Sequence, residues 1–124
     1  MAEELVTLET AKMLRKKGFN EYCKDIIRED NGRMMQSVFR TNNDLPKGAY
    51  SRPTQSIAAK WLRETKNLHI EIYRNACGYG YAIVKANNGT WMEDDDAKGP
   101  NDSGNWDTYE EALEAGIFEA LKLI

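Results

Sequence analysis

The residues with the clearest metal-binding chemistry are three consecutive aspartates at positions 94–96, followed by Gly99. In the calcium loop of EF-hand proteins, carboxylates take the first and third positions and glycine takes the sixth, which this run reproduces. Lys98, however, stands where a further ligand is needed, and Asn105 replaces the glutamate that closes the calcium loop. We therefore interpret the run as a solvated acidic loop and expect neither a metal ion nor another cofactor.

Nucleophilic catalysis would need a cysteine or serine beside a base. The single histidine, His69, is separated from Cys77 by eight positions, which is about 25 Å along an extended strand. These two residues therefore cannot form a dyad if both belong to one hairpin. The sequence does not place Cys23, so a pair of His69 with Cys23 stays open. One histidine and two scattered cysteines are too few for a zinc site, and we expect no enzymatic activity.

The net charge of −3 conceals an asymmetry along the chain. Residues 1–88 carry fifteen Lys and Arg against ten Asp and Glu, whereas residues 89–124 carry two against ten. This excludes a uniformly cationic nucleic-acid-binding protein but leaves room for a basic patch. An accessory nucleic-acid-binding role is therefore the alternative function, and its candidate basic surface consists of Arg15, Lys16, Arg52, Lys60 and Arg63.

Apolar spacing predicts three amphipathic helices. The first covers residues 8–17 with Thr7 as its N-cap, and the second covers roughly 53–66, capped by Ser51 or Thr54 and stopped at Asn67. The last begins at the capping box of residues 108–111 and runs to the end of the chain. The acidic start of this helix would repel phosphates, which argues against a double-stranded-RNA-binding domain despite the matching order of elements.

Alternating apolar residues between the second and last helices predict a three-stranded meander over residues 68–74, 79–87 and 90–93. Pairing Arg74 with Tyr79 makes one face apolar throughout and sets Tyr73 opposite Gly80. That apolar face should pack on the helices. The opposite face is the candidate binding site, formed by His69, Tyr73, Val84 and Trp91. The alternative is that residues 34–39, or another part of residues 20–49, cover this face.

Two regions carry weaker signals. Residues 20–49 form a variable, insert-like region, in which Tyr22, Ile26 and Ile27 have the spacing of a helical turn. Residues 34–39 favour a strand, the Asn31-Gly32 dipeptide favours a turn, and residues 41–48 favour a loop. Residues 94–105 are acidic and rich in Gly, Asn, Asp and Ser, so we expect a flexible, exposed loop there. The sequence thus predicts one α+β domain, residues 1–124, with a three-stranded antiparallel meander packed against two or three helices.

Three amphipathic stretches occur in a characteristic order: residues 5–12 with Gly18-Phe19, residues 53–64, and residues 108–115 with Ala120-Leu121. In this order they resemble an uncharacterised family of small phage and prophage proteins of gut Bacteroides-type bacteria. The resemblance covers the helices and implies a phage context, with the bacterial cytoplasm or a virion as the location; it brings no catalytic residues. No apolar run is long enough to span a bilayer. We therefore expect a small soluble protein without membrane association that binds a host or phage protein.

Overall fold

The computed structural model describes residues 4–30, 34–95, 98–101 and 104–124, with only the backbone of residues 34–40. It confirms the α+β class. The chain divides into two compact units, Met1–Thr54 and Gln55–Ile124, which are described separately below. A single domain over residues 1–124 stays a prediction.

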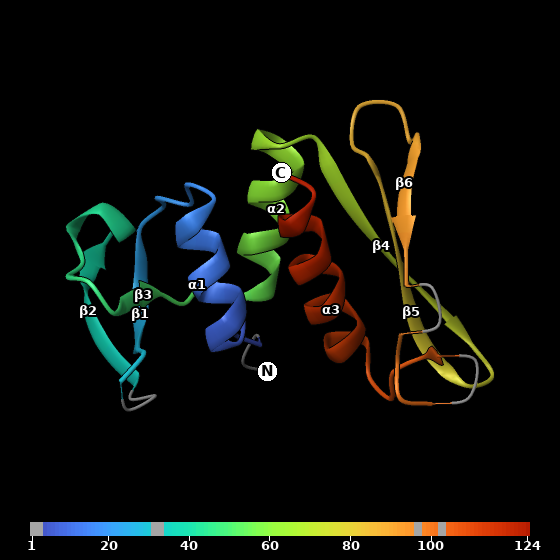
Figure 1. The fold of residues 1–124 in the computed structure, drawn as a ribbon, viewed down its shortest axis with the longest axis horizontal. Helices are drawn as coiled ribbons and strands as arrows, with labels where there is room; N and C mark the ends of the chain where they lie inside the picture. Colours follow the sequence, from blue (N-terminus) through green and yellow to red (C-terminus); the bar gives the residue numbers. More distant parts are fainter. Residues whose placement is uncertain (1–3, 31–33, 96–97, 102–103) are drawn as a thin grey trace. The chain divides into compact units, whose positions relative to one another are not determined.

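The first unit begins with helix α1, Leu8–Lys16 (Figure 1). The Thr7 hydroxyl accepts a hydrogen bond from the Thr10 amide at 3.3 Å, which satisfies one of the free N–H groups of the first turn. At the other end, Gly18 takes a φ of 96°, and the Phe19 amide donates to the Leu14 carbonyl at 2.9 Å. The predicted helix and its N-cap are confirmed.

The first unit also contains a sheet with the strand order β2-β1-β3. Its central strand β1, Cys23–Arg28, lies between β2, Met34–Arg40, and β3, Ala49–Ser51. The predicted helical turn at Tyr22, Ile26 and Ile27 is therefore wrong, because pairing with two neighbouring strands satisfies this backbone in an extended conformation. The predicted strand at 34–39 is confirmed, and the Asn31-Gly32 turn lies outside the described residues.

The connection from β2 to β3 is mostly loop, as predicted, with a short 3₁₀ helix η1 over Asn42–Asp44. The buried Asn42 side chain holds this loop on both sides. Its Nδ2 donates to the Phe19 carbonyl at 2.7 Å, and its Oδ1 accepts from the Ser51 amide at 2.9 Å. Since Ser51 belongs to β3, it is not the cap of the next helix.

The second unit begins with helix α2, Gln55–Thr65, which is shorter than predicted by about one residue at its end and two at its start. Asn67 follows with a φ of 58° and stops the helix in the left-handed conformation, as expected. A three-stranded meander follows with the order β4-β5-β6. Its strands are β4, Leu68–Asn75, β5, Gly78–Lys85, and β6, Trp91–Asp94 (Figure 1).

The predicted register between β4 and β5 is confirmed. Arg74 pairs with Tyr79, and Tyr73 pairs with Gly80. On the inner face of the sheet, side chains are buried or half-buried against helices; these are Leu68, Ile70, Ile72, Tyr81 and Ile83. Helix α3, Tyr109–Lys122, packs on β4 and β5, and α2 packs on α3 and β4 (Figure 1).

Helix α3 begins at the predicted N-cap, Thr108, which bonds with Glu111. The Thr108 hydroxyl oxygen accepts from the Glu111 amide at 3.1 Å and lies 2.9 Å from the Glu111 carboxylate, to which it donates. Gly116 faces the sheet from the middle of the helix, and a Cβ there would lie only 2.8 Å from Ile70 Cγ2. This glycine therefore lets α3 approach the sheet closely. Among the described residues, no helix is both long and apolar enough to cross a membrane.

Candidate binding face on the outer side of the second sheet

The face of the meander opposite α3 is defined here as the outer face; it consists of His69, Glu71, Tyr73, Ala82, Val84, Trp91 and Asp94. Two rows cross all three strands. His69 pairs with Val84, which pairs with Trp91, and Glu71 pairs with Ala82, which pairs with Asp94. The structure therefore brings three of the four predicted binding residues into one cross-strand row, with Tyr73 on the same face.

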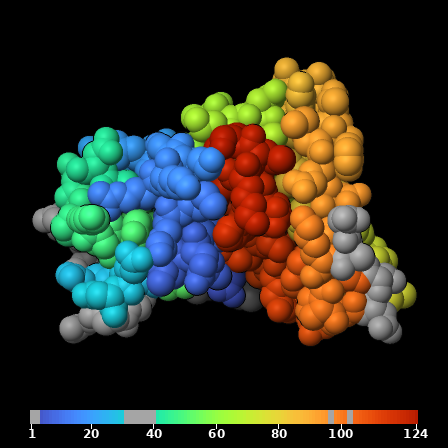
Figure 2. All heavy atoms as spheres, viewed as in Figure 1, coloured from blue at the N-terminus to red at the C-terminus, as the bar shows by residue number. Residues whose placement is uncertain are grey.

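A β-bulge orients the two β6 residues of the outer face. Trp91 and Asp94 are three positions apart, so in a regular strand they would point to opposite faces. The register shifts between Ile83 and Val84, which leaves Met92 as the extra residue and returns Trp91 to the outer face. The Trp91 side chain is 62% exposed, and Met92 is 37% exposed. Atoms of β6 lie at the molecular surface (Figure 2).

Tyr73 is held in place on the outer face by two features. Its ring lies over Gly80, where an added Cβ would come within 2.3 Å of Tyr73 Cζ. Its hydroxyl donates to Asp95 Oδ2 at 2.6 Å. Burial of the hydroxyl and this carboxylate raise the pKa of Tyr73 to about 12. The glycine and the carboxylate thus fix the orientation of a ring whose residue is still 41% exposed.

The acidic segment that follows β6 is attached to the β4–β5 hairpin. The Asp95 amide donates to the Tyr81 carbonyl at 3.1 Å, and Asn101 Nδ2 donates to the Cys77 carbonyl at 3.0 Å. Asn105 Oδ1 accepts from Asn75 at 3.0 Å. Asp95 and Asn105 are buried, at 6% and 1% exposure. The prediction of an exposed loop over 94–105 is therefore wrong for these two residues, because both make side-chain hydrogen bonds to the hairpin.

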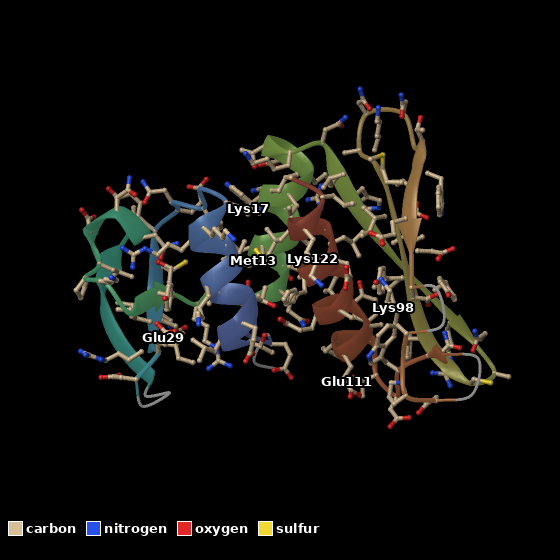
Figure 3. The ribbon with its side chains drawn as sticks, in the orientation of Figure 1. Met13, Lys17, Glu29, Lys98, Glu111 and Lys122 are labelled. Atoms are coloured by element: carbon tan, nitrogen blue, oxygen red, sulfur yellow. The ribbon has the colours of Figure 1, made fainter. Side chains whose placement is uncertain are left out.

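Lys98, which is labelled in Figure 3, forms ion pairs with two acidic side chains. Its Nζ is 3.6 Å from Glu93 of β6 and 3.8 Å from Glu119 of α3. The fully buried Tyr81 hydroxyl has no hydrogen-bond partner among the described residues. Burial, followed by the charge of Glu119, raises the pKa of Tyr81 well above that of a free tyrosine.

The catalytic and metal candidates do not converge. No group of three or more potential ligands from His, Cys, Asp and Glu occurs in the described part of the chain, and Asp96 lies outside it. His69 pairs with Val84, whereas Cys77 lies in the turn at the far end of the same hairpin, so the argument against this dyad stands. Burial raises the pKa of Cys23 to about 11, which keeps that thiol protonated and weakly nucleophilic at neutral pH.

The five residues of the candidate basic surface divide into two groups. Arg15 donates to the carbonyls of residues 45, 46 and 49 at 2.5–3.1 Å, and Arg52 Nε donates to the Val6 carbonyl at 2.6 Å. Both guanidinium groups therefore hold the first unit together. Lys16, on α1, and Lys60 and Arg63, on α2, are exposed. The sequence does not reveal this division, because the positions of Arg15 and Arg52 in the sequence look no different from that of the exposed Arg63.

Comparisons of the chain with family models, with curated proteins and with solved structures gave no match. The function proposed below therefore rests on the residues and contacts described above. Sequence reasoning found the outer face itself. It missed the Met92 bulge and the buried carboxylate of Asp95, neither of which has a local sequence signal.

Proposed function

We propose that the protein is a non-enzymatic interaction module of phage or prophage origin, and that its outer face binds a host or phage protein. The observation that supports this proposal is the exposure of Trp91, at 62%, at the end of the row that continues through Val84 and His69. Tryptophan is enriched among the residues that dominate protein–protein binding energy. An indole left in water on a sheet therefore favours a binding role over a structural one.

The support beneath Trp91 strengthens the proposal. A side chain fixed before binding loses less conformational entropy when a partner binds. Trp91 pairs with Val84 of the central strand, and Tyr73 is fixed by Gly80 and Asp95. The Tyr73 ring is thus held in place before binding, and Trp91 stands on a paired strand of the same sheet.

The nucleic-acid alternative has less support. Arg15 and Arg52 already use their guanidinium groups in hydrogen bonds to backbone carbonyls. Lys16 of α1 and Lys60 and Arg63 of α2 remain as exposed cations, but exposed cations are common on solvated helix faces. A gel-shift assay at low salt, with single- and double-stranded probes, tests this alternative, because phosphate-dominated binding is strongest there and weakens as salt rises.

The proposal is tested by affinity capture from a bacterial host lysate, with the wild type and the variant Trp91→Ala as baits. Tyr22→Ala is the matched control, since Tyr22 is 67% exposed but belongs to the first unit. We expect a defined partner to be recovered by the wild type and by Tyr22→Ala and lost with Trp91→Ala. Its affinity, measured with the purified partner, should fall roughly 30-fold with the tryptophan variant. Equal affinity of both variants would contradict the proposal.

Tyr73→Ala is a poor substitute for Trp91→Ala in this test. Removing Tyr73 would leave the buried Asp95 carboxylate without its hydroxyl donor, so lost binding could reflect a disturbed fold. Trp91 is exposed, so its truncation leaves the buried Asp95 carboxylate and its hydroxyl donor in place. Matching thermal unfolding and amide NMR spectra for both variants would establish that the capture experiment reports the surface alone.

A further inference from the structure

We propose that β4 is the contact of a symmetric dimer, in which the β4 strands of two copies of this chain pair antiparallel and join their two meanders into one continuous sheet. This inference goes beyond the proposed function, because it concerns the edge of the sheet and not its outer face. It starts from the strand order β4-β5-β6, in which β4 pairs with β5 on one side only within the described part of the chain. The other side of an edge strand presents N–H and C=O groups to which another strand can bond.

Hydrogen bonds of β5 show which β4 residues have such groups. Tyr79 exchanges two backbone hydrogen bonds with Trp106, at 2.8 and 2.9 Å, on the side of β5 that faces away from β4. Backbone directions alternate along a strand, so the next residue, Gly80, directs its groups towards β4, where it pairs with Tyr73. The odd-numbered residues of β4 therefore bond to β5, and the even-numbered residues direct their backbone groups away from it.

The outward backbone groups belong to Ile70, Ile72 and Arg74. They make no backbone hydrogen bond to described residues outside the sheet. Residues 71 and 73–75 are exposed and Ile72 is half-buried, whereas the start of the strand is buried. The half of β4 that follows Ile70 is therefore accessible to a further strand.

Strand β4 lacks features that commonly block an edge. It is eight residues long, contains no proline or lysine, and pairs with β5 without a bulge. The opposite edge strand, β6, has four residues and contains the bulge at Met92. Short length, bulges, proline and lysine each discourage pairing with another chain. This contrast favours β4 over β6 as the edge that associates.

A second copy fits this edge because the strand is complementary to itself. The charged residues of β4, Glu71 and Arg74, have opposite signs and lie on opposite faces of the sheet, so an identical strand is not repelled. A two-fold axis at Ile72 sets the two half-buried Ile72 side chains opposite each other and pairs Ile70 with Arg74 of the second copy. This register forms roughly six backbone hydrogen bonds. An axis at Glu71 would instead set two carboxylates directly opposite each other.

Amide hydrogen exchange of the full-length wild type tests the pairing directly, measured by NMR in dilute and in millimolar solution, with the dimer fraction determined by sedimentation. The Glu71 and Tyr73 amides bond to β5 and should be protected in both solutions. The Ile72 and Arg74 amides should exchange quickly when dilute and slow by at least about tenfold as the dimer forms. A protein that is monomeric at millimolar concentration, or a dimer in which these two amides still exchange quickly, would overturn the proposal.

A proline variant tests the same hydrogen bonds by removing one from each strand. Arg74→Pro deletes an outward N–H and keeps every bond to β5, and proline is tolerated at such edge positions. Its dimer dissociation constant should rise at least about tenfold, because the symmetric contact loses two hydrogen bonds. Arg74→Ala is the matched control, since it removes the same side chain and keeps the N–H; it should dimerise within about twofold of the wild type. Equal weakening by both variants would assign the contact to the side chain and contradict strand pairing.

Trp91→Ala separates this dimer from binding at the outer face. Strand β6 lies at the opposite edge from β4, so this variant should dimerise as the wild type does. Loss of the dimer with Trp91→Ala would place the contact on the outer face and would refute the β4 pairing. If Arg74→Pro does not fold, as thermal unfolding would show, the amide exchange of the wild type decides the question alone.

Discussion

The close contact between α3 and the sheet at Gly116 gives a testable prediction for Gly116→Ala. The sign of the change in the free energy of unfolding shows whether helix propensity or steric overpacking prevails. A Cβ added at this position would lie 2.8 Å from Ile70 Cγ2 and 3.2–3.3 Å from Tyr81 Cγ and Cβ. The Tyr81 atoms belong to the root of a fully buried side chain, and Ile70 is 9% exposed. The neighbouring groups therefore have little freedom to move away from an added methyl group.

Two opposing contributions set the expected magnitude for Gly116→Ala. Helix propensity alone would stabilise the protein by about 0.8–1.0 kcal/mol, because alanine restricts the unfolded chain and favours the helix. Forcing a methyl group into a well-packed core costs roughly 1–3 kcal/mol. We expect the steric cost to prevail, so that the free energy of unfolding falls by about 1 kcal/mol. The reverse sign would follow if α3 could shift freely.

Equilibrium unfolding in urea, followed by tryptophan fluorescence, is the suitable assay. All the tryptophans, Trp61, Trp91 and Trp106, belong to the unit Gln55–Ile124 that also contains Gly116, so the signal reports that unit. Ala115→Gly is the matched control, because it makes the reverse substitution one position away in the same helix. It should destabilise by about 1 kcal/mol through propensity.

A double substitution isolates the steric contact. Ile70→Ala alone should cost about 2–5 kcal/mol, as expected for truncating a buried isoleucine. It also removes the Cγ2 atom nearest to the new methyl group. The cost of Gly116→Ala in the Ile70→Ala background should therefore shrink by at least about 0.5 kcal/mol. A stabilising effect of Gly116→Ala in the wild type, or strict additivity in the double variant, would refute the close-packing argument.

The remaining predictions concern three groups with unusual surroundings. Tyr81→Phe should leave the free energy of unfolding in urea unchanged or raise it by up to about 1 kcal/mol, because the buried hydroxyl lacks a partner among the described residues. A fall in the free energy of unfolding would show that the hydroxyl makes a stabilising hydrogen bond. Tyr73→Phe should cost about 1–3 kcal/mol by losing the bond to Asp95, and should abolish an ultraviolet titration step near pH 12 that the wild type retains. Cys23 should react with a disulfide reagent at pH 8 far more slowly than Cys77, and equal rates would contradict its burial. Because the pKa of Cys23 is raised to about 11, the unfolded chain loses this proton at lower pH than the folded protein does. The contribution of Cys23 to the free energy of unfolding should therefore be complete below about pH 9 and disappear towards pH 11. Cys23→Ala should flatten this pH dependence.

The elements that were predicted correctly carry their signals within a few residues. Thr7 and Thr108 each lie directly before an amphipathic run and accept an amide three residues on. Asn67 supplies the left-handed stop of α2. The register of β4 and β5 followed because only one pairing places Ile70 opposite Ile83 on an apolar face.

The elements that were missed depend on contacts distant in the chain. Strand β1 contains Ile26 and Ile27 side by side, both buried, so it shows no simple alternation. Its extended conformation is set by pairing with β2 and β3 on both sides, and β3 is only three residues long. Neither strand can be distinguished from a turn or loop without knowledge of the other, because the pairing itself supplies the stabilising hydrogen bonds.

The same distinction separates the parts of the candidate site. Alternation in the sequence predicted Trp91 and Val84 on one face. The bulge at Met92 places Asp94 on that same face, although it is three positions from Trp91. Asp95, one residue further, is buried and bonded to Tyr73, although it belongs to the same run of aspartates. The neighbouring aspartates 94 and 95 therefore differ in placement: Asp95 orients an aromatic ring from within the structure, while Asp94 lies on the outer face with Glu71. Substitutions at Glu71 should consequently alter binding without altering the fold, and substitutions at Asp95 should alter both.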